Sequence, residues 1–357
     1  MKNKTVLIVL PFVLISLLTG IYTGWLRMGW NFPMTEVMGQ HGLIMVGSFL
    51  GTLILIERIV GLKKRWLYSL PLINVLSLPA LIVKAVEPAL IFLIIGTTGL
   101  IGVYGMIYRK YKEKYIIIMM TGAALLLFGL VLLLIGYRYP VAVPYWMGFL
   151  LLTILGERID LAKFLPARKL KNPLLGFFII VFITGLFTQY YWIGPLLTGI
   201  GMMLISIWLL KYDIVNKSMR SHGIHQYIGV VLFTGYLWLF ITGFLMTVNL
   251  NIVYFYDALL HSFFLGFVFL MIFAHAPIIF PGVMGFSFTP FHKSFYTWMV
   301  LLNLSLLFRI LSDLFFLNQP RQISGLFNGM VLIGFFINLL IVIRNKYLSS
   351  RKIGTQN

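Results

Sequence analysis

The sequence predicts an all-α, polytopic transmembrane helical bundle of about twelve helices. Hydrophobic residues make up 60% of the 357 residues and charged residues only 10%, a composition that no water-soluble domain has. The apolar runs reach about 20 residues, which is the length a helix needs to cross a bilayer. Because no polar linker separates these runs, we expect one integral membrane domain over residues 1–357.

The apolar runs, taken in order, give the expected helices. They lie at about 5–26, 34–60, 66–84, 87–108, 115–136, 141–156, 173–191, 193–211, 224–249, 253–280, 292–317 and 323–344. The first run follows Lys2 and Lys4, as in a secretory signal peptide. It continues through Trp25 without an Ala-x-Ala cleavage site, so we expect a retained first membrane helix.

The net charge of +19 is distributed unevenly over the loops. With the N-terminus inside, the inside loops and termini hold 23 of the 28 basic residues, and Arg309 lies within a helix. The outside loops hold only Arg27, Lys84, Arg138 and Arg321. This asymmetry follows the positive-inside rule and predicts a multi-pass protein of the cytoplasmic membrane with both termini in the cytoplasm. The positive charge then faces anionic lipid, and nucleic acid is not an expected partner.

Two inside helix ends repeat a short motif, Glu57-Arg58 and Glu157-Arg158. One interpretation is a pair of proton-accepting carboxylates, as in a proton-coupled secondary transporter. The other is an interfacial ion pair that ends each helix near water, and we favour this one because many cations flank the motif.

Two histidines, His41 and His261, lie at matching depth near the outer ends of two helices that run in the same direction. An imidazole inside a membrane is costly and marks a functional site by default, although a hydrogen bond to a neighbouring helix can also account for one. Two at one level suit the axial positions of a heme iron, so we expect heme b as the cofactor. Asp257, four residues before His261, is either the hydrogen-bond partner of a metal-bound imidazole or a cap near the helix start.

The remaining candidates are His275, Arg309 and Asp313. His275 stands before Pro277, which we expect to break the helix because proline lacks a backbone donor. It is equally consistent with a second metal site or proton path and with a bond to carbonyls freed by proline. Arg309 is expected to pair with Asp313, one turn along, or with a carboxylate of the cofactor at the level of the two histidines.

In topology and depth the pattern resembles the catalytic subunit of the heme–copper oxidases. That resemblance implies a low-spin heme held by His41 and His261 in helices 2 and 10, with Arg309 of helix 11 at its propionates. The sequence departs from that family at the copper site, since the runs at 141–156 and 173–191 contain no histidine. The chain also contains no cysteine, so neither thiolate metal sites nor a covalently attached heme is possible. Copper is therefore not expected.

The segments His41-Gly-Leu-Ile-Met and His261-Ser-Phe-Phe-Leu-Gly resemble the NnrS-type polytopic heme proteins linked to nitric-oxide tolerance. The resemblance implies a membrane b-type heme protein in electron transfer, or in sensing or tolerance of nitric oxide or dioxygen. If it is an enzyme, it is expected to be a heme-dependent oxidoreductase, with a redox protein as a partner. The alternatives are a proton-coupled secondary transporter and an accessory membrane subunit.

Overall fold

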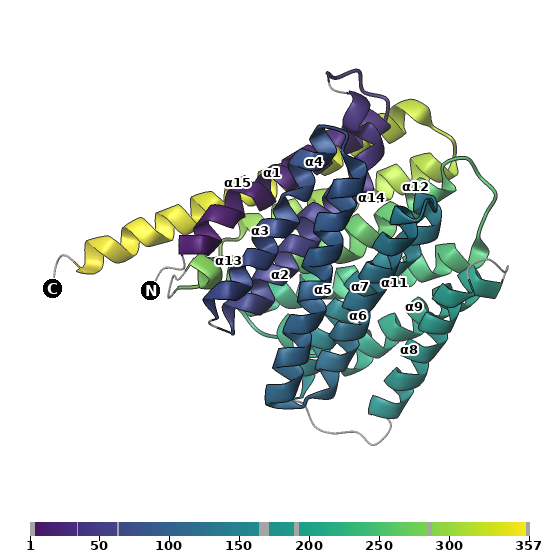
Figure 1. Ribbon diagram of the computed structural model, residues 1–357. Helices are drawn as coiled ribbons and strands as arrows, with labels where there is room; N and C mark the ends of the chain where they lie inside the picture. The colour runs from purple at the N-terminus through teal and green to yellow at the C-terminus, as the bar shows by residue number, and fades with distance from the viewer. Residues whose placement is uncertain are drawn as a thin grey trace. The chain divides into compact units, whose positions relative to one another are not determined.

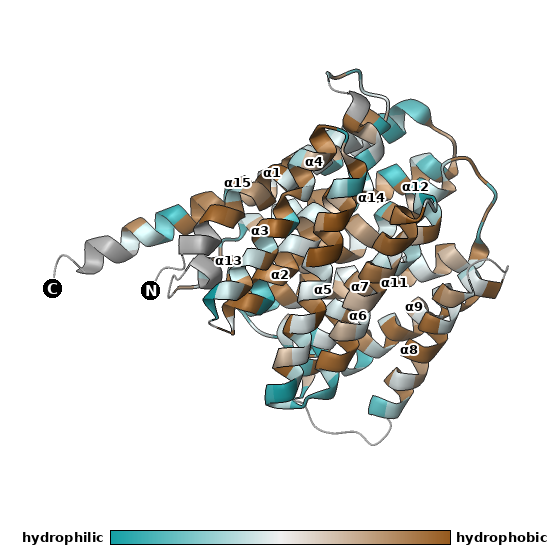
Figure 2. Cartoon of the chain, in the orientation of Figure 1, coloured by the Kyte–Doolittle hydropathy of each residue, from teal (hydrophilic) through white to brown (hydrophobic). Residues whose placement is uncertain are grey.

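The computed structural model describes residues 4–33, 35–62, 64–163, 171–188, 193–284 and 288–354. Within these ranges every regular element is a helix, and eleven helices are long and apolar enough to cross a membrane. The expected helix at 173–191 is α8 (Lys171–Phe187), which is shorter than the other spans. Figure 2 shows the long helices brown over most of their length, with teal residues gathered toward helix ends and loops. These findings confirm a polytopic, all-helical membrane chain.

The chain forms two compact units, which we call the N-terminal unit and the C-terminal unit. The N-terminal unit runs to residue 172 and adds residues 180–197, and the C-terminal unit holds residues 173–179 and 198 onward. Helices α8 and α9 (Ile193–Tyr212) therefore contribute to both units. The single domain expected from the sequence stays a prediction.

The N-terminal unit contains ten further elements in chain order (Figure 1). They are α1 (Lys4–Arg27), η1 (Thr35–Gln40), η2 (Leu43–Gly51), α2 (Thr52–Val60), η3 (Arg65–Tyr68), α3 (Ser69–Val75), α4 (Ser77–Ile82), α5 (Val86–Tyr111), α6 (Lys114–Leu134) and α7 (Tyr139–Ala162). Glycines let α6 approach α7 closely, because a Cβ on Gly122 would lie 2.9 Å from the carbonyl oxygen of Phe149. With Trp146 and Phe149 almost fully buried, α7 forms the centre of this unit.

The C-terminal unit contains the other seven elements. They are α10 (Val215–Met219), α11 (Gly223–Val248), α12 (Phe255–His261), η4 (Ser262–Phe269), α13 (Leu270–Met284), α14 (Ser294–Leu314) and α15 (Asn318–Gly354). In this unit α9 and α11 approach at Gly199 and Gly243, where a Cβ on Gly199 would lie 2.4 Å from the carbonyl oxygen of Gly243. Helices α14 and α15 pack as an antiparallel pair, and Trp298 fills the space beside Gly334.

Three expected helices have a different internal structure, and the one expected at 34–60 is divided into η1, the π-helix η2 and α2. The helix expected at 66–84 is divided into η3, α3 and α4, and the break falls at Leu76. Pro79 contributes to this break because it cannot donate to the carbonyl of Val75. The helix expected at 253–280 changes to a π-helix at η4, directly after His261, and then continues as α13.

The expectation that Pro277 breaks its helix is wrong, since α13 continues through Pro277 and Pro281 to Met284. Pro277 removes the donor that the carbonyl of Phe273 would otherwise have. The hydroxyl of Tyr227 on α11 donates to that carbonyl at 3.3 Å. Membrane helices tolerate proline where a neighbouring helix satisfies the freed carbonyl in this way.

Candidate functional site

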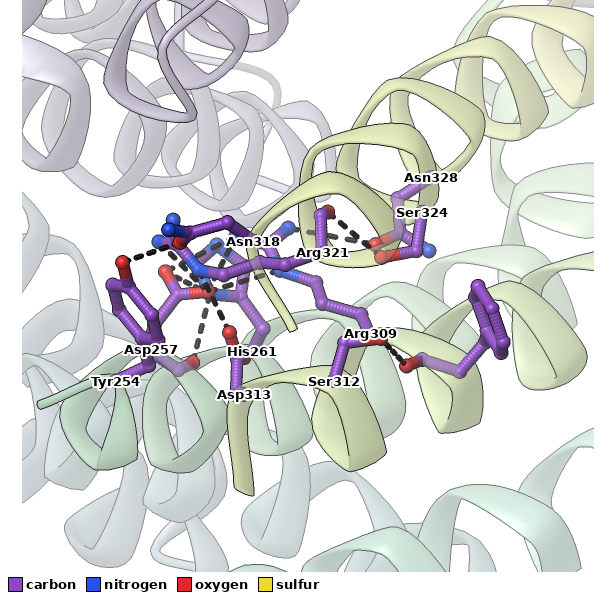
Figure 3. A network of polar contacts seen from close by, with 11 residues as sticks. Tyr254, Asp257, His261, Arg309, Ser312, Asp313, Asn318, Arg321, Ser324 and Asn328 are labelled. Carbon is purple, nitrogen blue, oxygen red and sulfur yellow. Dashed lines mark hydrogen bonds and ion pairs between the residues drawn. The ribbon is translucent and has the colours of Figure 1, made fainter. Parts of the chain in front are cut away.

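His261 and Asp257 lie on one face of α12, one helical turn apart, at the place where α12, α14 and α15 meet (Figure 3). The Nδ1 atom of His261 lies 2.9 Å from the backbone carbonyl of Asp257 and 3.2 Å from its carboxylate Oδ1. A carbonyl oxygen only accepts, so Nδ1 carries the proton and the lone pair of the neutral ring is on Nε2. This is the arrangement that supports a metal-bound imidazole, and it confirms the predicted contact between Asp257 and His261.

Arg309 of α14 holds Asp257 by an ion pair with both carboxylate oxygens. Its Nη2 lies 3.1 Å from Oδ1 and 2.9 Å from Oδ2, and its Nε lies 3.1 Å from Oδ2. Arg309 is only 5% exposed, so this pair is made largely out of contact with water. Among the contacts described, Arg309 pairs with Asp257 of the neighbouring helix, a partner that the sequence did not predict for it.

Asp313 pairs with Arg321, a residue that the predicted topology places in an outside loop. Arg321 lies in the first turn of α15, with its Nε 2.8 Å from Oδ1 of the fully buried Asp313. Its Nη2 lies 3.7 Å from Asp257 Oδ2, and its guanidinium stacks 4.2 Å from the ring centroid of Tyr254. The sequence contained one sign that Arg321 is unusual: few basic residues lie in the outside loops of the predicted topology.

The cluster of Asp257, His261, Arg309, Asp313 and Arg321 thus contains two carboxylates and two guanidinium groups. With His261 neutral, these charges balance, which is what a site inside an apolar bundle requires. Within this cluster, His261 contacts Asp257, and it does so through Nδ1.

His41, in the N-terminal unit, is held by α1 in a similar way. Its Nδ1 lies 2.8 Å from the backbone carbonyl of Gly20 and 3.3 Å from the hydroxyl of Thr23. A Cβ on Gly24 would lie 3.1 Å from the imidazole Cε1, so the ring needs a glycine beside it. As in His261, the carbonyl at Nδ1 places the lone pair of the neutral ring on Nε2.

Both histidines lie just before a π-helical segment: η2 begins at Leu43, two residues after His41, and η4 begins at Ser262, directly after His261. Such segments are rare and occur mainly at functional sites. Buried polar side chains support η2: the Asn74 amide donates to the Gly47 carbonyl at 3.1 Å and to the Thr52 hydroxyl at 2.6 Å. These segments were not predictable from the sequence, because their hydrophobic pattern does not differ from that of an ordinary buried helix.

His275 does not join either of these clusters among the contacts that are described. Its Nδ1 lies 2.7 Å from the carbonyl of Met271 in its own helix. That carbonyl is not the one freed by Pro277, which Tyr227 serves. Across the described ranges, no group of three or more His, Cys, Asp or Glu side chains gathers as a metal site would require.

The predicted ion pair is confirmed at the Glu57-Arg58 motif, and Arg58 makes a second pair that the sequence did not predict. Arg58 of α2 contacts Glu157 of α7, and its Nη2 lies 3.5 Å from Glu57. Arg58 therefore pairs with its neighbour in sequence and also joins two helices. It does not end them, since α2 continues to Val60 and α7 to Ala162.

Comparison with known proteins adds a family without adding an activity. No curated protein and no solved structure matches the chain. A family model described as a domain of unknown function, DUF8744, matches residues 6–344, and the chain belongs to this family.

Proposed function

We propose that this chain is a multi-pass membrane protein that binds b-type heme and acts in electron transfer, or in sensing or tolerance of a diatomic gas. The observation that supports this most directly is the shared state of His41 and His261. Each imidazole directs Nδ1 to a backbone carbonyl, which fixes the tautomer with the lone pair on Nε2. Each also lies one or two residues before a π-helical segment.

The donor set fits heme better than other metal centres. Heme iron needs only axial ligands from the protein, and imidazole is the commonest of these. Cysteine, which iron–sulfur clusters need, is absent from the sequence. When bound, heme would supply a one-electron iron couple. The protein's own contribution is to hold the two rings: the Gly20 carbonyl orients His41, and Asp257 orients His261.

Arg309 and Arg321 are the proposed anchors for the cofactor in the C-terminal unit. A guanidinium has five N–H donors, so it can donate to a second carboxylate while it is paired with a first. Its planar fork matches the two oxygens of a carboxylate. We propose that this pair of arginines also donates to a carboxylate of the cofactor. Asp257 and Asp313 keep the cations in place and limit the net charge.

The test is the absorption spectrum of protein purified in detergent after expression with ample heme. We expect a Soret band and sharp α and β bands in the reduced state, because two imidazoles give a low-spin, six-coordinate iron. His41→Ala and His261→Ala should each remove this low-spin spectrum. His225→Ala, which changes an exposed histidine at the start of α11, is the matched control and should leave it unchanged. A colourless wild-type protein would refute the proposal.

Carbon monoxide separates the two roles within the proposal. A reduced iron with two tightly held imidazoles leaves no position for a gas, so an unchanged spectrum favours electron transfer. A shifted Soret band shows that one imidazole gives way to the gas, which favours sensing or tolerance.

A further inference from the structure

A pocket in the C-terminal unit lies where α11 and α14 begin. Its volume is about 490 Å³, and it is lined by Gly223, Gln226, Val230, Phe291, Lys293 and Tyr296. This volume is in the range of small-molecule sites in proteins. Because α11 and α14 are both long and apolar enough to cross a membrane, their first residues lie where the spans meet water. A ligand of this pocket is therefore bound at a membrane surface.

Aromatic packing forms one wall of the pocket. The ring of Tyr296 makes an edge contact with the ring of Tyr227, with 5.2 Å between their centroids. The ring of Phe291 lies 6.2 Å from that of Tyr227, which is fully buried in α11. These contacts hold Phe291 and Tyr296 against α11, so the pocket is part of the packed structure. Tyrosine is common at this depth in membrane proteins because its ring is apolar and its hydroxyl is polar.

Lys293 gives the pocket a positive charge that nothing in the C-terminal unit neutralises. The only acidic residues in the sequence of this unit are Asp213, Asp257 and Asp313. Asp213 is buried and accepts from the hydroxyl of Tyr236, and the other two belong to the arginine cluster described above. Lys293 forms no ion pair in the described part of the chain. The pocket therefore favours an anionic ligand.

Two more lysines lie at the same end of this unit. Lys346 of α15 donates to the carbonyl of Thr289, two residues before the aromatic wall begins. Lys217 is exposed on α10, which packs on the first turns of α11: a Cβ on Gly229 would lie 2.4 Å from the backbone nitrogen of Met219. A cluster of basic residues at the end of membrane helices attracts anionic lipid headgroups.

Apolar side chains continue from the pocket along both helices. On α14, the exposed Val300 and Leu304 follow Tyr296 at intervals of four residues, so the three share one helix face. On α11, the exposed Leu237 follows Val230 by two turns. A ligand with an anionic head and long apolar chains would contact both the pocket and these rows, whereas a small soluble anion would use the pocket alone.

We propose that this pocket binds one anionic glycerophospholipid, with its phosphate at Lys293 and its acyl chains along α11 and α14. The Gln226 amide and the Tyr296 hydroxyl are further donors for the headgroup at the same pocket. The site shares no residue with the proposed heme site. Arg309 lies thirteen residues beyond Tyr296 on α14, a rise of about 20 Å along the helix.

The test is native mass spectrometry of the full chain in detergent, titrated with phosphatidylglycerol or with phosphatidylcholine of the same acyl chains. The wild-type protein should bind one phosphatidylglycerol more tightly than one phosphatidylcholine. Lys293→Gln should weaken phosphatidylglycerol binding by about fivefold, which is the contribution of one basic residue to the attraction of an anionic lipid, and should affect phosphatidylcholine less. Equal affinities of the wild-type protein for the two lipids would overturn the proposal.

Two further variants separate the pocket from a general attraction by basic residues. Lys217→Gln is the matched control, since Lys217 is an exposed lysine at the same end of the unit that does not line the pocket. It should weaken phosphatidylglycerol binding much less than Lys293→Gln, and an equal loss would show that the pocket has no part in it. Val230→Phe fills the pocket and leaves every charge in place, so it should weaken the binding of both lipids. Undiminished binding by Val230→Phe would place the lipid elsewhere.

Inorganic phosphate distinguishes a lipid headgroup from a soluble anion. Added at the concentration of the lipid, it should not displace phosphatidylglycerol, because it lacks the acyl chains that contact α11 and α14. Displacement would show that the pocket takes a soluble anion, and the lipid assignment would be wrong. None of these measurements depends on heme, so the lipid site and the proposed function can fail independently.

Discussion

Arg309 on α14 holds both carboxylate oxygens of Asp257 on α12, with its Nη2 3.1 Å from Oδ1 and 2.9 Å from Oδ2. Asp257 in turn accepts from Nδ1 of His261. The order Arg309, Asp257, His261 therefore links a buried cation to a candidate iron ligand, and a change at one end should be measurable at the other.

Replacing Arg309 with leucine leaves Asp257 without its main counter-ion. Breaking a buried ion pair by removing one partner costs about 3 kcal/mol, so the variant should be less stable and should retain less heme. Its midpoint potential should fall, because a lost positive charge favours the oxidised iron. Redox titration and heme analysis measure both effects, and Arg309→Lys should recover the potential in part because it keeps the charge without the planar fork. Unchanged heme content and potential in Arg309→Leu would place the cofactor away from α14.

Replacing Asp257 with asparagine keeps an oxygen acceptor for His261 and removes the negative charge. We expect the midpoint potential to rise, since that charge stabilises the oxidised iron through the imidazole. Asp313→Asn is the matched control: it also removes a carboxylate, but one that pairs with Arg321 and does not contact His261. Its shift should be smaller. Equal shifts of the midpoint potential in the two variants would mean that the Asp257 charge acts on the iron through space and not through its contact with His261.

Tyr227 and Pro277 form a second testable pair. Removing the hydroxyl in Tyr227→Phe leaves the Phe273 carbonyl without its donor and should cost about 1–2 kcal/mol of unfolding free energy. Pro277→Ala returns a backbone N–H to that carbonyl, so the double variant should be more stable than Tyr227→Phe alone. Thermal unfolding of the four proteins in one detergent gives the coupling. Additive effects would show that Tyr227 does not compensate for Pro277.

Metal analysis addresses the copper site. The segments 141–156 and 173–191 contain no histidine and the chain contains no cysteine, so we expect iron without stoichiometric copper and no turnover of dioxygen by the protein alone. One tightly bound copper per chain would contradict this. His275→Ala would then be the first variant to test, since His275 is the membrane histidine with no other proposed role.

Much of the fold was predictable from the sequence because bilayer length and hydropathy dictate where helices form. The spans, the membrane class and the contact of Asp257 with His261 all depend on residues close in sequence, where helix geometry alone sets the distance. The break at Leu76 and the passage of α13 through Pro277 were not predictable with the same certainty. In both places, a proline's effect depends on whether another helix supplies the missing donor.

The sequence by itself therefore determined that this protein is a helical membrane protein, and it named His41, His261, Arg309 and Asp257 as the polar residues that need an explanation. Only the tertiary structure decided their partners. Arg309 has an aspartate one turn along its own helix, and packing of α12 against α14 brings Asp257 into contact with it as well. Arg58 likewise had a glutamate beside it in sequence, yet it also contacts Glu157 on α7. A long charged side chain in an apolar interior pairs with a counter-ion that helix packing brings near. The spacing of residues along the sequence does not predict that packing.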